Sequence, residues 1–134
     1  MDFVIDIRNP DARVLDRLAQ TCSDVCEKIA VQSGCASRVT RRLAIEPRDF
    51  DPDCIAAVQS AADELGLRNQ KIASDALHDA SNIVALASTA MIFVPCRDGI
   101  SHNFAEYASP EDLTARCEVL LHAMLSRAGR VTGL

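Results

Sequence analysis

The first 46 residues read as a strand, a helix and a second strand, and this order is the feature that most limits the fold. Alternating apolar residues at 3–7 predict a half-buried strand. Apolar residues at helical spacing then predict a long amphipathic helix from Asn9, its expected N-cap, to Gly34. The pattern of 35–45 is strand-like again. Two strands and one helix are half of a four-stranded α+β sandwich, which needs further strands or another subunit.

The rest of the chain alternates helical patterns with short apolar runs. Each of the two longest helical patterns begins with an N-cap residue followed by proline and ends before a glycine. A continuous apolar run at 91–94 predicts a strand that is buried on both faces of a sheet, so we expect the α/β class. The apolar stripe expected on the last helix is Leu113, Cys117, Leu120, Leu121, Met124 and Ala128. The predicted helices are 52–65, 78–87 and 110–128, and the other predicted strand is 69–73.

Composition fits a folded globular chain and excludes several functions. The 134 residues are 49% hydrophobic, and 14 Lys and Arg against 19 Asp and Glu give a net charge of −5 without any basic run. The longest apolar stretch, 83–94, is too short and too polar in places to span a bilayer, and the first six residues do not resemble a secretion signal. We expect a cytoplasmic protein with no nucleic-acid or membrane partner.

Six cysteines could form three disulfides, but a normal apolar fraction without a signal peptide favours reduced thiols. Cys22, Cys26 and Cys117 fall on apolar helix faces, where a thiol behaves as a small hydrophobic group. Cys22 and Cys26 lie one turn apart and could form one edge of a metal site. No second pair or nearby histidine completes a tetrahedral set.

The polar loop 96–107 follows the predicted buried strand and is the strongest candidate site, because open α/β sheets bind ligands beyond the carboxyl ends of strands. His102 lies in it with Ser101, Asn103 and Glu106 nearby. This setting suits a neutral imidazole ligand whose tautomer is fixed by a carboxylate or amide. A single histidine specifies no metal, and a surface histidine is an equal alternative.

Three other residues are weaker candidates. His78 with Asp79 could be a base or a ligand, but both are also ordinary residues of a first helical turn. His122 is expected at the rim of the last helix. Arg8, at the end of the first strand, could bind a carboxylate through its planar fork, although an exposed strand end also explains it. The chain has no glycine-rich phosphate loop, nucleophile elbow or HExxH motif.

Two motifs, Gly-Ile-Ser-His-Asn at 99–103 and Met-Ile-Phe-Val-Pro at 91–95, are the most specific parts of a pattern that covers nearly the whole chain. The pattern resembles the C-terminal third of the hydantoinase/carbamoylase family of amidases. This family includes N-carbamoyl-L-amino-acid hydrolases, allantoate amidohydrolases and β-ureidopropionases, within the zinc aminopeptidase/aminoacylase superfamily. The matching segments besides these two motifs are 4–10, 50–52, 74–80, 105–107 and 109–112, and the first motif extends back to Asp98.

The resemblance implies an α/β catalytic domain that holds two divalent metals and an inserted α+β lid that forms the dimer interface. It implies that residues 1–47 are the second half of the lid and that 48–134 are the end of the catalytic domain. His102 matches the last metal ligand of the family. Arg8 matches the lid arginine that binds the substrate carboxylate, and His78 matches the histidine of a loop beside that site.

The chain departs from the family in two ways. The family loop Ser-Gly-Ala-Gly-His-Asp-Ala is Ser-Asp-Ala-Leu-His-Asp-Ala here, with Asp75 and Leu77 in place of glycines that allow close backbone approach to a ligand. The other metal ligands and the glutamate base of the family lie in an N-terminal part that this chain lacks. One histidine cannot hold two metals or activate their water.

We therefore interpret the chain as part of a metal-dependent hydrolase of C–N bonds other than peptide bonds. Its substrates would be N-carbamoyl amino acids or ureido acids such as allantoate. The intact enzyme would hold Zn²⁺ or Mn²⁺, and this chain alone would hold no metal stably and be inactive. An alternative is a non-catalytic assembly module, a homodimer or a partner of a full-length homologue or separate N-terminal half, joined through the lid strands. A degenerate relic is a third possibility.

Overall fold

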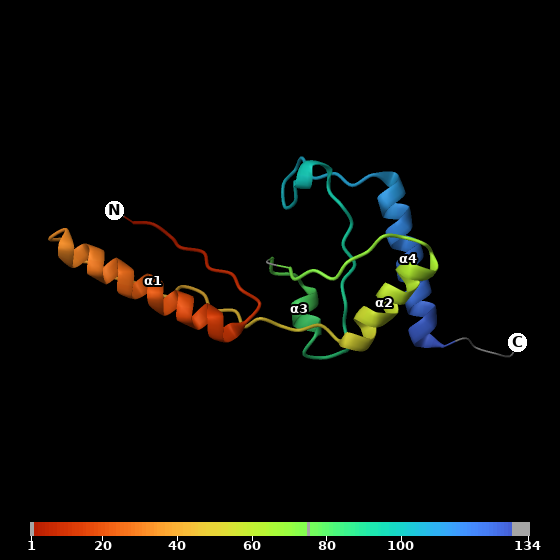
Figure 1. The fold of residues 1–134 in the computed structure, drawn as a ribbon, viewed down its shortest axis with the longest axis horizontal. Helices are drawn as coiled ribbons and strands as arrows, with labels where there is room; N and C mark the ends of the chain where they lie inside the picture. Colours follow the sequence, from red (N-terminus) through yellow and green to blue (C-terminus); the bar gives the residue numbers. More distant parts are fainter. Residues whose placement is uncertain (1, 75, 130–134) are drawn as a thin grey trace, which may run out of the picture. The chain divides into compact units, whose positions relative to one another are not determined.

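The computed structural model describes residues 2–74 and 76–129. The chain divides into two compact units, one built from 1–48 and 73–77 and the other from 49–72 and 78–134. Figure 1 shows the helices of both units. The division at 48/49 falls beside the boundary that the sequence predicts at 47/48. The roles assigned to the two parts stay predictions.

The first unit is organised around one long helix, α1 (Ala12–Gln32). The predicted N-cap at Asn9 is wrong. Asp11 caps the helix, because its side chain accepts hydrogen bonds from the backbone N–H groups of Arg13 and Val14, and Asn9 Oδ1 instead accepts from the Asp11 N–H at 2.9 Å. The predicted stop at Gly34 is confirmed by its φ of 67°, which glycine adopts without strain.

None of the predicted strands forms within residues 2–74 and 76–129. The strand predictions for 3–7, 35–45, 69–73 and 91–94 are therefore wrong for this chain, and the α/β class is confirmed only in its helical part. A strand needs a ladder of backbone hydrogen bonds to a neighbour. In the described part, backbone bonds outside the helices are turns, helix ends and isolated links such as Asp51 N to Thr89 O (3.0 Å).

The second unit is held by two packed helices, α2 (Pro52–Glu64) and α4 (Pro110–Ala128). Both predicted N-caps are confirmed. Asp51 accepts from the Cys54 N–H at 2.8 Å, and Ser109 Oγ accepts from the Asp112 N–H at 3.0 Å while donating to its carboxylate. The buried core consists of four small or medium side chains, whose size lets the two helices approach closely: Ala61, Ala62, Val119 and Ala123.

Two shorter elements complete this unit. α3 (Ala80–Ile83) is one turn long, so the helix predicted over 78–87 is wrong in length, and 84–87 form turns instead. The 3₁₀ turn η1 (Arg97–Gly99) follows the apolar run 91–94. Ile92 of that run packs against the core of α2 and α4.

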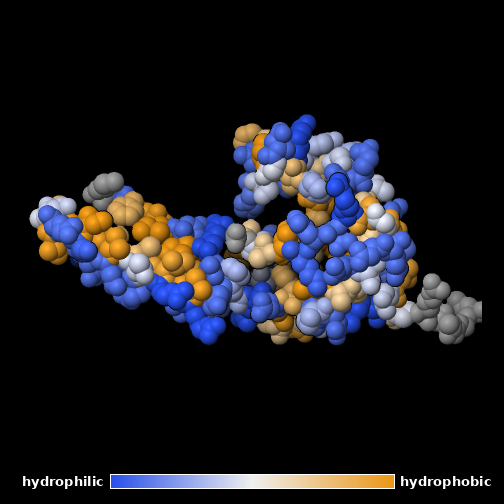
Figure 2. All heavy atoms as spheres, viewed as in Figure 1, coloured by the Kyte–Doolittle hydropathy of each residue, from blue (hydrophilic) through white to orange (hydrophobic). Residues whose placement is uncertain are grey.

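The predicted apolar stripe of α4 is wrong as a core face. Its residues are exposed, with Leu120 at 44% and Met124 at 60%, whereas the buried side chains of α4 are Val119 and Ala123. α1 has no buried residue along its described length, and its apolar side chains gather on one surface of the helix (Figure 2). Helical periodicity predicted these faces, but the described residues provide no second surface to cover them.

All six cysteines are free, as the sequence predicts. Cys22 and Cys26 are half-buried on α1, but Cys117, expected in the core, is exposed. No helix in the described part of the chain is long and apolar enough to cross a membrane.

Candidate functional site

The loop 96–107 is closed at its base by two contacts between the same residues. The Arg97 N–H donates to the Tyr107 carbonyl at 2.8 Å, and the Arg97 guanidinium lies 4.5 Å from the centre of the Tyr107 ring. Sequence analysis missed this cation–π pair, and the residue types ten positions apart give no signal for it. The closure makes the loop, which includes η1, a defined structure ahead of α4.

His102 has an uncommon backbone conformation within this loop. Its φ is 56°, in the left-handed region that residues other than glycine rarely adopt, and Asp98 has a φ of 58°. The Glu106 carboxylate stabilises this geometry, since its Oε2 accepts the His102 backbone N–H at 2.6 Å. The side chain of His102 is exposed.

This arrangement corrects one detail of the sequence interpretation. A carboxylate or amide beside His102 was expected to fix the tautomer of its ring, but Glu106 binds the His102 main chain through its Oε2. Its Oε1 accepts a weak bond from Cys96 Sγ at 3.9 Å. Glu106, four residues after His102, therefore stabilises the turn through the His102 backbone and not through the imidazole.

His78 lies at the start of the segment that leads into α3. Its ring lies 5.5 Å from that of Phe93, centre to centre, at 58°, and its carbonyl accepts the Ser81 N–H at 2.9 Å. The half-buried His78 thus contacts the apolar run that precedes the loop of His102. The structure shows His78 packed against an aromatic ring, and its predicted role beside a substrate remains a prediction.

Arg8 belongs to the first unit and already binds a carboxylate. Its Nη2 lies 2.6 Å from Asp6 Oδ2, and its Nε donates to both Asp6 oxygens at 3.1 and 3.2 Å. The pKa of the Asp6 carboxyl is lowered mainly by this hydrogen bond from Arg8. The guanidinium therefore binds the Asp6 carboxylate through more than one N–H group, and its predicted role with a substrate stays a prediction.

The two substituted positions of the predicted substrate loop are only partly described. Asp75 lies outside the described residues. Leu77 is 65% exposed, and the Ala76 N–H donates to Ser74 Oγ at 3.3 Å. The large apolar side chain of Leu77, at a position where the resemblance implies glycine, is therefore exposed.

The residues present do not fit a complete metal centre. Among residues 2–74 and 76–129, no group of three or more His, Cys, Asp or Glu is placed to hold an ion. His102 offers one imidazole, and the carboxylate of Glu106 accepts hydrogen bonds from the His102 backbone and the Cys96 thiol. A stable site for a catalytic divalent metal takes three or more protein ligands.

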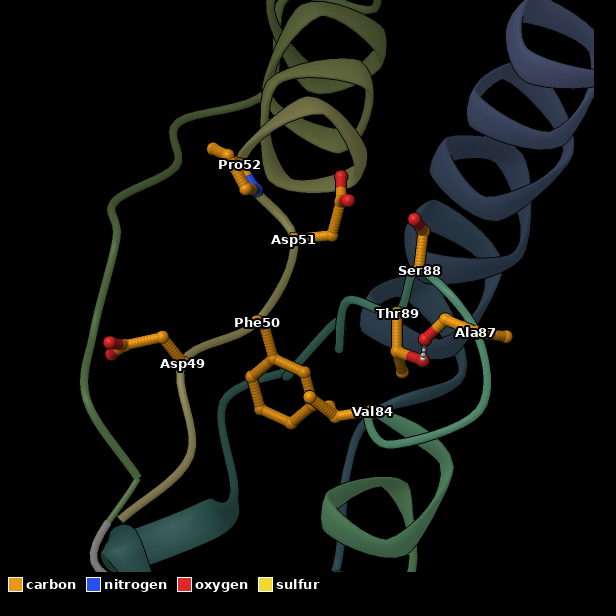
Figure 3. A pocket seen from close by; sticks show the side chains of 8 residues that line it. All are labelled: Asp49, Phe50, Asp51, Pro52, Val84, Ala87, Ser88 and Thr89. Carbon is orange, nitrogen blue, oxygen red and sulfur yellow. Dashed lines mark hydrogen bonds between the residues drawn. The ribbon is translucent and has the colours of Figure 1, made fainter.

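A separate pocket lies at the start of α2, with a volume of about 320 Å³ (Figure 3). Phe50, Val84 and Asp51 are among the residues that line it. The pKa of Asp51 is lowered mainly by the N–H of Cys54 and then by a hydrogen bond from Ser88. None of the predicted site residues Arg8, His78 and His102 lines this pocket, so it is not the predicted site.

Comparison with known proteins identifies the family. A family model described as peptidase family M20/M25/M40 matches residues 5–126. The chain belongs to this family. The N-carbamoyl-L-amino-acid amidohydrolase of Rhizobium meliloti is 38% identical over 130 residues, which are 94% of this chain and 30% of that protein. The allantoate amidohydrolase of Bacillus subtilis (strain 168) is 34% identical over 113 residues, 84% of this chain and 27% of that protein.

Solved structures agree with the sequence relatives. An amidase of the hydantoinase/carbamoylase family from Burkholderia multivorans superposes with a TM-score of 0.86 at 43% identity, over 90% of this M20 chain and 29% of its own. A family member from Burkholderia ambifaria superposes with a TM-score of 0.84 at 34% identity, over 93% and 29%. The resemblance to hydantoinase/carbamoylase amidases is thus confirmed. The chain spans about 30% of the length of these relatives.

Proposed function

We propose that this chain is one part of a metal-dependent amidohydrolase that cleaves linear C–N bonds of N-carbamoyl amino acids or ureido acids such as allantoate, and that it is inactive alone. The observation that carries the proposal is the loop of His102, an exposed imidazole on a backbone held in a strained conformation by Glu106. Strained backbone persists where surrounding structure imposes it, and it is concentrated at functional sites. The relatives that are similar in sequence to this chain include an N-carbamoyl-L-amino-acid amidohydrolase and an allantoate amidohydrolase.

The inactivity of the isolated chain follows from its ligand count. His102 would be one ligand of a divalent metal, Zn²⁺ or Mn²⁺, and the described residues group no further ligands around it. The remaining ligands and the general base would come from the part of the enzyme that this chain does not span. Such a metal supplies charge stabilisation and an activated water only when its coordination is complete.

The other two site residues would act on the substrate. Arg8 would bind the substrate carboxylate, in exchange for Asp6, through the same N–H groups. His78 would lie beside the substrate, with its ring orientation set by Phe93. This chain would act in the cytoplasm, as the sequence analysis expects.

The first test is an assay of the purified chain with N-carbamoyl amino acids and with allantoate, in the presence of Zn²⁺ or Mn²⁺. A His102→Ala variant is the control, and a His122→Ala variant is a matched control because that histidine is also exposed. We expect no turnover above the His102→Ala background. Turnover that only His102→Ala abolishes would mean that the 134 residues supply a complete site, and the proposed inactivity would be wrong.

A second candidate function is a non-catalytic assembly module that pairs through its first segment. The observation that favours it is the exposure of Phe3 at 66%, Val4 at 73% and Ile5 at 48% in one short stretch. Such a module would form a homodimer or bind a full-length homologue. Light scattering on the chain alone and mixed with the Rhizobium meliloti relative tests this, with Val4→Glu expected to abolish any complex and Arg13→Glu, at an exposed position of α1, expected to keep it.

A further inference from the structure

The loop 96–107 contains two residues other than glycine with a left-handed backbone. Asp98 has a φ of 58° and His102 has a φ of 56°. Residues 101–107 are all exposed, so burial does not hold the backbone of His102 in this region. A residue with a Cβ is disfavoured there by about tenfold relative to glycine. The stabilisation must therefore come from polar contacts of the loop.

Two of these contacts act on parts of the loop other than His102. The Arg97 N–H donates to the Tyr107 carbonyl at 2.8 Å and closes the base of the loop. Asn103 stabilises the turn that follows His102, because its carbonyl accepts the Glu106 N–H at 2.9 Å. The base and this turn leave the conformation of His102 to be set by another contact.

The side chain of Glu106 makes a contact that acts on His102 directly. Its Oε2 accepts the His102 N–H at 2.6 Å, and a hydrogen bond to a carboxylate is stronger than one to a neutral acceptor. The Cys96 thiol donates to Oε1 at 3.9 Å, so the residue that begins the loop contacts the other oxygen of the same carboxylate. The φ of a residue sets the direction of its side chain and the rotamers that are allowed. A contact with the His102 main chain therefore acts on the place of the imidazole.

We propose that Glu106 is a positioning residue for His102: it holds the His102 backbone in the left-handed region and thereby fixes where the imidazole lies. The contacts run from the Cys96 thiol through the Glu106 carboxylate to the His102 N–H. In this role Glu106 is neither a metal ligand nor a base. The inference rests on the proposed function, because the place of the imidazole matters for activity only if His102 is a site residue.

The first measurement asks whether Glu106 sets the backbone of His102. In the isotopically labelled full chain, NMR measures the nuclear Overhauser effect between the N–H and the Hα of His102, two protons that are close together at positive φ. We expect Glu106→Ala to weaken this signal by about threefold, as the backbone returns to negative φ. Glu106→Gln should preserve it, because the amide oxygen still accepts the N–H. The same signal of Asp98, whose φ is similar, is the internal reference and should stay constant.

The second measurement is a double-mutant cycle, which isolates the coupling between two residues. Glu106→Ala should lower the folding equilibrium constant of the second unit by about tenfold, but by about twofold or less in a His102→Gly background, because glycine adopts positive φ without help. Asp98→Gly is the matched control, since it removes a Cβ from the other left-handed residue of the same loop. In that background Glu106→Ala should keep its full effect. Urea unfolding followed by circular dichroism gives the constants.

Three results would overturn the inference: a His102 signal that Glu106→Ala leaves unchanged, Glu106→Gln behaving like Glu106→Ala, or equal losses in the His102→Gly and Asp98→Gly backgrounds. Glu106 is exposed and lies outside the α2–α4 core, so its variants are expected to fold. These measurements use neither substrate nor metal. Coupling of Glu106 to His102 in a protein whose complete form lacks amidohydrolase activity would refute only the proposed function. Activity without that coupling would refute only the positioning role.

Discussion

The ends of α1 and α2 follow the same local rules, but only α2 contributes to a core. Gly34 and Gly66 end the two helices with φ values of 67° and 68°, and in each case the N–H of the next residue donates to the carbonyl five residues back at 2.9 Å. Yet no residue of α1 is buried, whereas Ala61 and Ala62 of α2 are 3% and 5% exposed.

The difference shows that helix formation and helix burial depend on different parts of the sequence. N-caps and C-terminal glycines act within a few residues, so both helices have an N-cap and a glycine at the end. Burial needs a second apolar surface, and α2 finds it in α4, some fifty residues later in the chain. The apolar face of α1 has the right spacing and meets no such surface among the described residues of its unit.

The largest expected effect is a difference in the free energy of unfolding between a charge placed in the α2–α4 core and the same charge placed on α1. Ala123→Asp puts a carboxylate into the α2–α4 core, where it lacks a partner, and should reduce the free energy of unfolding of that unit by about 3 kcal/mol or more. Val25→Asp puts the same charge on the apolar face of α1, where the native side chain is 47% exposed, and should cost about 0.5 kcal/mol or less. Urea unfolding followed by circular dichroism measures both.

Equal losses for the two variants would break the comparison, because they would mean that the face of α1 is as buried in solution as the α2–α4 core. Ala128→Asp is the control for helix propensity, since it changes the same residue type at an exposed position of α4. It should behave like Val25→Asp.

Much of the local structure could be predicted from the sequence. The helix starts at Asp51 and Ser109, each followed by proline, and the stops at Gly34 and Gly66 were correct because each depends on neighbouring residues alone. The start at Asn9 was two residues early, since Asn and Asp lie close together there and either can cap a helix.

The strands and the facing of α4 could not be predicted in the same way. Apolar alternation at 3–7 identifies a strand only if another strand pairs with it, and the pairing is not encoded in those residues. In α4 the small Val119 and Ala123 form the core, because small side chains allow close packing against the alanines of α2. The sequence analysis chose the exposed face of α4 as the core face because the larger leucines lie on it.

The candidate site shows the same limit. The sequence identified the loop of His102 and the nearby Glu106, but the contact that Glu106 makes with the His102 backbone depends on a φ of 56°. Asn, Asp and His adopt the left-handed conformation more often than other residues except glycine. The composition of the loop therefore allowed this conformation without specifying it. That Arg8, His78 and His102 act in one site stays a prediction.

The second effect sharpens the comparison at the helix ends. Gly66→Ala and Gly34→Ala each force alanine into a left-handed conformation, at a cost of about 1 kcal/mol, and neither new Cβ meets an atom within 4 Å. The cost at Gly66 should appear in the global stability of the second unit, because the adjacent Leu67 packs against its core. The cost at Gly34 should appear only as fraying of α1.

Amide hydrogen exchange distinguishes the two outcomes. Faster exchange throughout α2 and α4 in Gly66→Ala, with a change limited to the last turn of α1 in Gly34→Ala, is the expected result. Exchange that increases along the whole of α1 in Gly34→Ala would show that this helix also unfolds as one cooperative unit.

A third effect concerns acid pH. The pKa of Asp51 is lowered in the folded chain by the Cys54 N–H and the hydrogen bond from Ser88, so its stabilising contribution is complete above the ordinary value of 3.8 and is lost as the pH falls through the folded pKa. Asp51→Asn can still cap α2 but does not titrate. The stability difference between the two proteins should therefore be larger at neutral pH than at a pH well below 3.8, and a constant difference would contradict the assignment.

The smallest effect concerns the ion pair that connects the segment 35–45 to α1. Arg41 Nη1 lies 3.2 Å from Asp16 Oδ1, with 51% and 68% of the two side chains exposed, and exposed pairs of this kind contribute about 0.5 kcal/mol or less. Arg41→Ala should therefore lower the melting temperature little more than Arg42→Ala, its exposed neighbour. A clearly larger loss would mean that the ion pair holds the segment on α1. The apolar face of the helix would then be partly covered from within its own unit, and the contrast with α2 would be one of degree.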